Sequence, residues 1–138
     1  MKKIIFTVFA LFWGGIRLMA DSAEITTADS KMDPGGGELV LAVRVEYETT
    51  PAALGAQLGL PAGWSLISVS GRTPPEIAPQ TGTTNRLEFA WTNAPGDQVN
   101  FEITVAYPAG APAVNLSGEV IIRAKGKPTR LPVSVLVE

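Results

Sequence analysis

The sequence predicts an all-β protein, an antiparallel β-sandwich of seven or eight strands. Three observations support this prediction. Apolar and polar residues alternate with a period of two in several windows, and no window carries a 3.6-residue apolar stripe. Turns rich in Gly and Pro separate these windows at short spacing, and the 138 residues include 14 Gly and 11 Pro. We favour a sandwich over a barrel because the inward residues are bulky and would fill the space between two facing sheets.

The clearest strand is expected at residues 38–48, after an opening strand at residues 24–27 and a turn at residues 33–37. The odd positions of residues 38–48 are apolar, whereas the even positions are mostly charged. Such alternation is typical of a strand with one buried face and one solvated face.

Two weaker strands are expected at residues 54–60 and 64–69, with Pro61-Ala62-Gly63 as a tight turn between them. Residues 71–84 form the longest irregular stretch and contain several prolines. We expect them to be an exposed loop in which Ile77, the one apolar side chain, plugs the edge of the sandwich.

The remaining strands are expected at residues 86–91, 98–107, 115–125 and 131–137. Residues 94–97 should join the first two of these as a short hairpin loop, and residues 108–112 should link the next pair. Val40 and Ile121 are apolar residues at outward positions, and they indicate a small adhesive patch on the surface.

Residues 1–20 have the layout of a secretory signal peptide, with cleavage predicted after Ala20. Lys2 and Lys3 precede the apolar run. A retained membrane anchor is the alternative, but the 13 residues of this run would rise only about 20 Å as a helix, less than the ~30 Å hydrocarbon core. The expected divisions are a signal peptide (1–20), a leader strand with a Gly-rich loop (21–37) and the sandwich domain (38–138).

Composition excludes several classes of function. The chain has no Cys and no His, so thiol and imidazole catalysis, disulfides and the usual zinc ligands are not available. Without residues 1–20 it carries 8 basic and 13 acidic side chains, a net charge of −5, which does not suit nucleic acid or anionic lipid. We therefore predict a non-enzymatic protein with no cofactor and no metal, no nucleic-acid partner, and no membrane contact after signal cleavage.

Four short segments occur in order along the chain: LPAGW at 60–64, LEFAWT at 87–92, YPAG at 107–110 and SGEV at 117–120. Over about residues 38–125, this pattern resembles an immunoglobulin-like module of secreted multidomain proteins in environmental Gram-negative bacteria. The resemblance implies an immunoglobulin-like sandwich. It assigns no function and carries over no catalytic residue.

Two functional hypotheses follow for a protein exported to the periplasm, the cell surface or the medium. The first is a structural or protein-interaction module at the cell envelope or outside the cell, with a protein partner there. Its candidate interaction residues lie in the irregular loop and are Arg72, Pro74, Pro75, Glu76 and Ile77. The edge of a terminal strand, which could pair with a strand of the partner, is a second candidate surface. The alternative is a carbohydrate-binding module for a polysaccharide, in which Trp64 and Tyr107 form an exposed aromatic platform.

Overall fold

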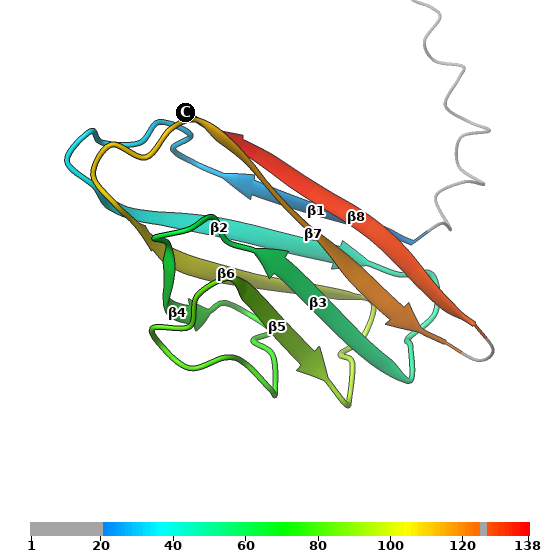
Figure 1. Ribbon diagram of the computed structural model, residues 1–138. Coiled ribbons are helices and arrows are strands. Elements are labelled where there is room, and N and C mark those ends of the chain that lie inside the picture. Colours follow the sequence, from blue (N-terminus) through cyan, green and yellow to red (C-terminus); the bar gives the residue numbers. More distant parts are fainter. Residues whose placement is uncertain (1–20, 125–126) are drawn as a thin grey trace, which may run out of the picture.

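The computed structural model describes residues 21–124 and 127–138, in which eight antiparallel strands form two stacked four-stranded sheets (Figure 1). The first sheet has the order β1 (Ser22–Thr27), β2 (Gly37–Glu46), β6 (Gln98–Tyr107), β4 (Ser65–Ser70). The second sheet has the order β5 (Arg86–Trp91), β3 (Ala53–Gly59), β7 (Val114–Arg123), β8 (Pro128–Val137). The predicted signal peptide, residues 1–20, lies outside the described residues.

The predicted all-β sandwich is confirmed, and each expected strand is present with its ends shifted by a few residues. The opening strand β1 is an integral part of the first sheet, since it pairs with β2 along its whole length. Within the described residues, no helix is long and apolar enough to cross a membrane.

The expectation of a hairpin at residues 94–97 is wrong. β5 belongs to the second sheet and β6 to the first, so these residues cross from one layer to the other. Alternation along the sequence reveals a strand but not its partner, and four extended residues are long enough to span the ~10 Å between packed sheets. Tyr47 holds this crossing, because its hydroxyl donates a hydrogen bond to the carbonyl of Pro95. Burial, and secondarily the Asp97 carboxylate, raise the pKa of Tyr47.

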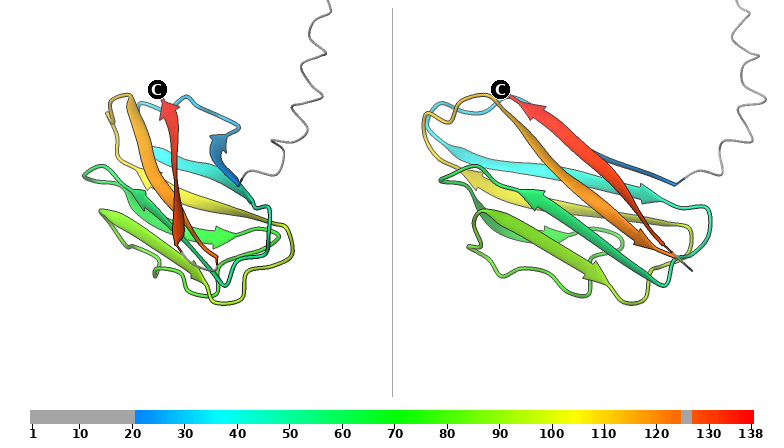
Figure 2. Two further views of the ribbon diagram at one scale, coloured as in Figure 1. Left: turned by 90° about the vertical axis from the view of Figure 1, so that its right-hand side faces the viewer. Right: turned by 45° about the vertical axis from the view of Figure 1, so that its right-hand side comes forward.

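The core lies between the two sheets, whose layered arrangement is seen end-on in Figure 2. Phe101 of β6 occupies its centre and meets two rings of β5 edge-on. The ring centroids lie 5.3 Å from Phe89 and 5.1 Å from Trp91. The inward residues predicted from the alternation are buried, among them Leu41, Val45, Leu87, Val99, Ile103, Val105, Leu116, Val120 and Ile122.

The Pro61-Ala62-Gly63 turn redirects the chain from the second sheet to the first. The N–H of Trp64 donates to the carbonyl of Pro61 over 3.1 Å, and Gly63 has a φ of 88°. A type II turn requires a positive φ at this position, which glycine adopts without steric cost. The predicted tight turn is therefore confirmed.

Gly118 marks the closest approach of β3 and β7, and it provides a test of the packing. A Cβ at this position would collide with the main-chain carbonyl of Gln57 and lie 2.9 Å from Cα of Leu58. We expect Gly118→Ala to destabilise the fold by about 2–4 kcal/mol, because the backbone of a paired strand must move to make room. Urea unfolding followed by circular dichroism measures this loss.

Gly96→Ala is the matched control for Gly118→Ala. Gly96 has no heavy atom within 4 Å of the added Cβ, so this change should alter stability by less than about 0.5 kcal/mol. Equal stability of the two variants would contradict the close approach of β3 and β7.

Candidate interaction surface

Trp64 and Tyr107 are core residues and not a surface platform. Trp64 is 2% exposed and Tyr107 is 8% exposed, and their rings contact each other with centroids 5.6 Å apart. The hydroxyl of Tyr107 accepts a hydrogen bond from the N–H of Asp33 over 2.8 Å. The carbohydrate-binding alternative requires these two rings to form an exposed platform. That expectation is wrong, because neither ring presents a face on which a sugar can stack.

The irregular stretch, residues 71–85, runs along one side of the sandwich from β4 of the first sheet to β5 of the second. Arg72 is exposed and lines a 310 Å³ hollow on the outer face of the first sheet. Pro74 is exposed and Pro75 is half-buried. The loop thus divides its predicted interaction residues between two sides of the molecule.

Glu76 fastens this loop to the end of β5. One carboxylate oxygen accepts hydrogen bonds from the N–H and the hydroxyl of Thr92, and the other accepts one from the N–H of Asn93 over 3.1 Å. The hydroxyl of Thr92, followed by the two N–H groups, lowers the pKa of Glu76. Glu76 is therefore a tether for the loop, and its two oxygens are already engaged within the chain.

Ile77 extends the second sheet by one residue beyond β5. Its N–H and carbonyl pair with those of Ala90 over 3.0 and 2.9 Å, as an isolated antiparallel bridge. The side chain does not plug the edge as expected, because it is 57% exposed. The bridge uses the main chain of Ile77 and leaves its side chain on the outer face, beside that of Ala90.

A shallow apolar depression lies next to Ile77 on the outer face of the second sheet. Its volume is about 230 Å³. Strand pairing places Ala90 opposite Gly55, and Gly55 opposite Ile121. These four residues, which form one row across the sheet, are Ile77, Ala90, Gly55 and Ile121. We call this feature the Ile77–Ile121 depression. The expected adhesive patch of Val40 and Ile121 is wrong, because the two residues lie on different sheets and Ile121 is only 9% exposed. Nothing in the sequence placed Ile77 and Ile121 in one row or identified Gly55 as the floor.

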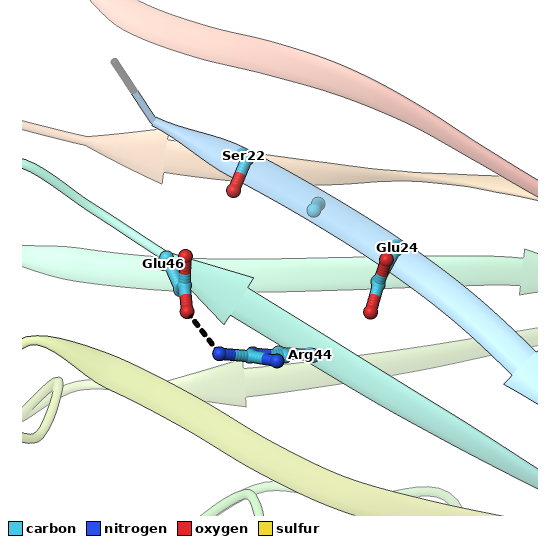
Figure 3. Close-up of a pocket in the computed structure, with 5 residues that line it drawn as sticks. Ser22, Glu24, Arg44 and Glu46 are labelled. Carbon is cyan, nitrogen blue, oxygen red and sulfur yellow. Dashed lines mark hydrogen bonds and ion pairs between the residues drawn. The ribbon is translucent and has the colours of Figure 1, made fainter. Parts of the chain in front are cut away.

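The outer face of the first sheet is polar by comparison. A hollow of about 170 Å³ lies on this face. In it, Ser22 and Glu24 of β1 lie beside the ion pair between Arg44 and Glu46 of β2 (Figure 3). Val40 is the large apolar side chain on this face, at 47% exposure. No group of three or more Asp, Glu, His or Cys side chains that could hold a metal occurs in residues 21–124 and 127–138.

The edges of both sheets are partly occupied by the chain itself. On β4, the N–H and carbonyl of Leu66 bond to Thr83 and Gly82. Directly after β8, the N–H and carbonyl of Glu138 bond to Ser30 and Met32 of the β1–β2 loop. These contacts leave less main chain for a partner strand to pair with.

The prolines of β8 protect its edge further. Alternate residues of a strand direct their backbone groups to opposite sides, so the even residues of β8 face the same side as Glu138. Pro128 and Pro132 are two of these residues, and neither has an N–H to offer there. The edges at β4 and β8 are therefore less available to a partner than the faces of the sandwich. β1, the other edge of the first sheet, makes no such main-chain contact within the described residues.

Comparison with solved structures finds a similar fold in a bacterial pilin and in bacterial and archaeal cohesins. The full-length major pilin SpaD from Corynebacterium diphtheriae is similar over 84% of this chain and 35% of its own length, with 14% identity and a TM-score of 0.59. The chain thus spans about a third of SpaD.

Two structures of cohesins are similar over almost their whole length. The complex of the third cohesin ScaC with the ScaB dockerin from Acetivibrio cellulolyticus has a TM-score of 0.55 at 5% identity, covering 84% of this chain and 99% of that one. A non-cellulosomal cohesin from Archaeoglobus fulgidus has a TM-score of 0.51 at 12% identity, covering 85% of this chain and 91% of that one. No protein-family model and no curated protein matches the sequence. At these identities, the likeness establishes a shared β-sandwich fold.

The burial of Trp64 leads to a first prediction about this region. We expect Trp64→Ala to lower the free energy of unfolding by about 3–5 kcal/mol, because it empties a fully packed site beside Tyr107. Urea unfolding measures the change. A variant as stable as the wild type would mean that Trp64 is not a core residue.

The tether formed by Glu76 predicts a pH dependence. A carboxyl whose pKa is lowered on folding stabilises the folded chain fully above its ordinary pKa of about 4.3, and this stabilisation is lost as the pH falls through the lower folded value. We expect the wild type to lose stability over this acidic range more steeply than Glu76→Gln. Urea midpoints measured from neutral to acidic pH provide the test, and parallel profiles for the two proteins would contradict it. Glu48→Gln is the control, since Glu48 is an exposed carboxyl outside this network.

Proposed function

We propose that the protein is an exported, non-enzymatic β-sandwich that binds another protein at the cell envelope or outside the cell. The observation that carries this proposal is the Ile77–Ile121 depression, a mainly apolar hollow on the outer face of the second sheet. It is bordered by the exposed side chain of Ile77, the buried side chain of Ile121, and the polar side chains of Gln57 and Glu88. Apolar surface of this kind is a common feature of protein-interaction sites. The main-chain contacts at β4, β5 and β8 favour a sheet face over these three edges as the site of contact.

The similar structures are consistent with this role. SpaD is a major pilin, and the ScaC cohesin was solved in complex with the ScaB dockerin. The signal-peptide pattern of residues 1–20 supports export. After export, the periplasm, the cell surface and the medium are the compartments in which a partner would be met.

We also propose that the chain is an immunoglobulin-like module of the kind found in secreted multidomain proteins. In an immunoglobulin domain, strands A, B, E and D form one sheet and C, F and G the other. The orders β1-β2-β6-β4 and β3-β7-β8 correspond to these two sheets, and β5 joins the second beside β3. One difference lies in the chain order, since β4, at the position of D, comes before β5 at the position of C′.

Substitution of Ile77 tests the proposed binding surface. We expect Ile77→Asp to reduce retention of a specific envelope protein by at least about tenfold, because the charge would have to be desolvated in an apolar contact. The immobilised chain is offered envelope extract, and retained proteins are quantified by mass spectrometry. Thermal unfolding confirms that the variant is folded.

Leu136→Asp is the matched control for Ile77→Asp. Leu136 is 53% exposed on β8 and lies outside the depression, so its substitution should leave retention unchanged. Equal retention by wild type and Ile77→Asp would show that the depression is not the binding surface.

A further inference from the structure

We propose that the Ile77–Ile121 depression receives Val40 of a second copy, so that the protein assembles head to tail through opposite faces of the sandwich. This inference rests on the proposed function, since it uses the same surface and names the partner that occupies it. Three features of the structure carry it: the shape of the depression, the isolation of Val40, and the charges around both.

The depression is open because its floor lacks side chains. Gly55 has none and Ala90 has a methyl group, whereas larger side chains border them at Ile77, which is exposed, and Ile121, which is buried. The row crosses three strand spacings from Ile77 to Ile121, which corresponds to about 14 Å. A single branched aliphatic side chain on a flat surface is a suitable occupant for such a hollow.

Val40 is an aliphatic side chain of that kind. It lies on the outer face of the first sheet, 47% exposed, near the middle of the long strand β2. Its neighbours on this face are small, with Ala42 two residues further along β2 and Thr104 opposite it on β6. Val40 therefore projects beyond the shorter side chains of Ala42 and Thr104 on a face that is otherwise polar.

The charges around these two features have opposite signs. Glu38 lies two residues before Val40 on the same face, and Glu102 lies opposite Ala42 on β6. Around the depression, Glu88 of the lining is ion-paired with Arg86, and Arg130, opposite Ile121 on β8, is ion-paired with Glu119. Arg123, two residues after Ile121 on β7, adds a further positive charge. When Val40 enters the depression of another copy, Glu38 and Glu102 approach surroundings in which positive charge is in excess by one, the guanidinium group of Arg123.

The same complementarity extends over the two faces. The outer face of the first sheet carries four carboxylates against two arginines, which are Glu24, Glu38, Glu46 and Glu102 against Arg44 and Arg72. The outer face of the second sheet carries three arginines against two carboxylates, which are Arg86, Arg123 and Arg130 against Glu88 and Glu119. Contact between two identical faces would oppose like charges, whereas contact between unlike faces pairs opposite ones.

The two surfaces lie on opposite outer faces of one sandwich, so the contact is heterologous (Figure 2). Each copy then offers Val40 to one neighbour and the depression to another. Such an interface produces a ring if the rotation closes and an open filament if it does not.

Sedimentation velocity of wild type and three variants tests this assembly. Each protein is expressed as the full chain from its own reading frame, and mass spectrometry determines the N-terminus of the purified product. Wild type should form species heavier than a dimer in a concentration-dependent way, and higher salt should weaken them by screening the charges. Val40→Asp and Ile77→Asp should each be monomeric when alone. Leu136→Asp, the control, should assemble like wild type.

Mixing the two monomeric variants gives the decisive result. Val40→Asp retains an intact depression and Ile77→Asp retains an intact Val40, so an equimolar mixture should form a dimer and nothing larger. A monomeric wild type, assembly of either single variant, or a mixture that stays monomeric would overturn the inference. Retention of an envelope protein by a wild type that is monomeric would overturn the self-assembly and leave the proposed function intact.

Discussion

The packing of Phe101 against Phe89 and Trp91 is the contact on which the rest of the structure depends. These rings meet edge-on across the space between the sheets, the geometry that the quadrupoles of aromatic rings favour. Phe101 lies on β6, between β2 and β4 in the first sheet, whereas Phe89 and Trp91 lie on an edge strand of the second. The cluster therefore joins two consecutive strands that do not pair with each other. Residues 94–97 cross between the layers in order to make this contact.

The loop of residues 71–85 follows from the same arrangement. It must return from β4 at the edge of the first sheet to β5 at the edge of the second, so it runs across the open side of the sandwich. On the way, its main chain bonds to Leu66 and Ala90, and its one carboxylate binds the end of β5. The polar atoms of the loop are largely engaged in closing the fold. The side chain of Ile77 is what this closure leaves on the surface.

The occupied edges and the character of the faces together determine how a partner can approach. Main-chain bonds at β4, β5 and β8, and the prolines of β8, limit the addition of another strand. The outer faces differ from each other, since one is polar with an isolated valine and the other holds a mainly apolar hollow and a small excess of arginines over carboxylates. A sandwich with two unlike faces is suited to contacts in a chain or a ring, and the scheme needs neither a bound ion nor a covalent link.

The sequence by itself determined the strands and the sides that they bury. Alternation of apolar and polar residues, as in residues 38–48 and 98–107, depends on neighbouring positions alone, and the inward residues it identified are buried. Tertiary structure decided which strands pair, because pairing depends on residues far apart in the chain and a short link can make a hairpin or cross between sheets. It also decided that Trp64 and Tyr107 are core residues, since alternation does not tell the end of a core from an exposed platform. The Ile77–Ile121 depression exists only in three dimensions, because strand register brings together Gly55, Ile77, Ala90 and Ile121 from separate segments.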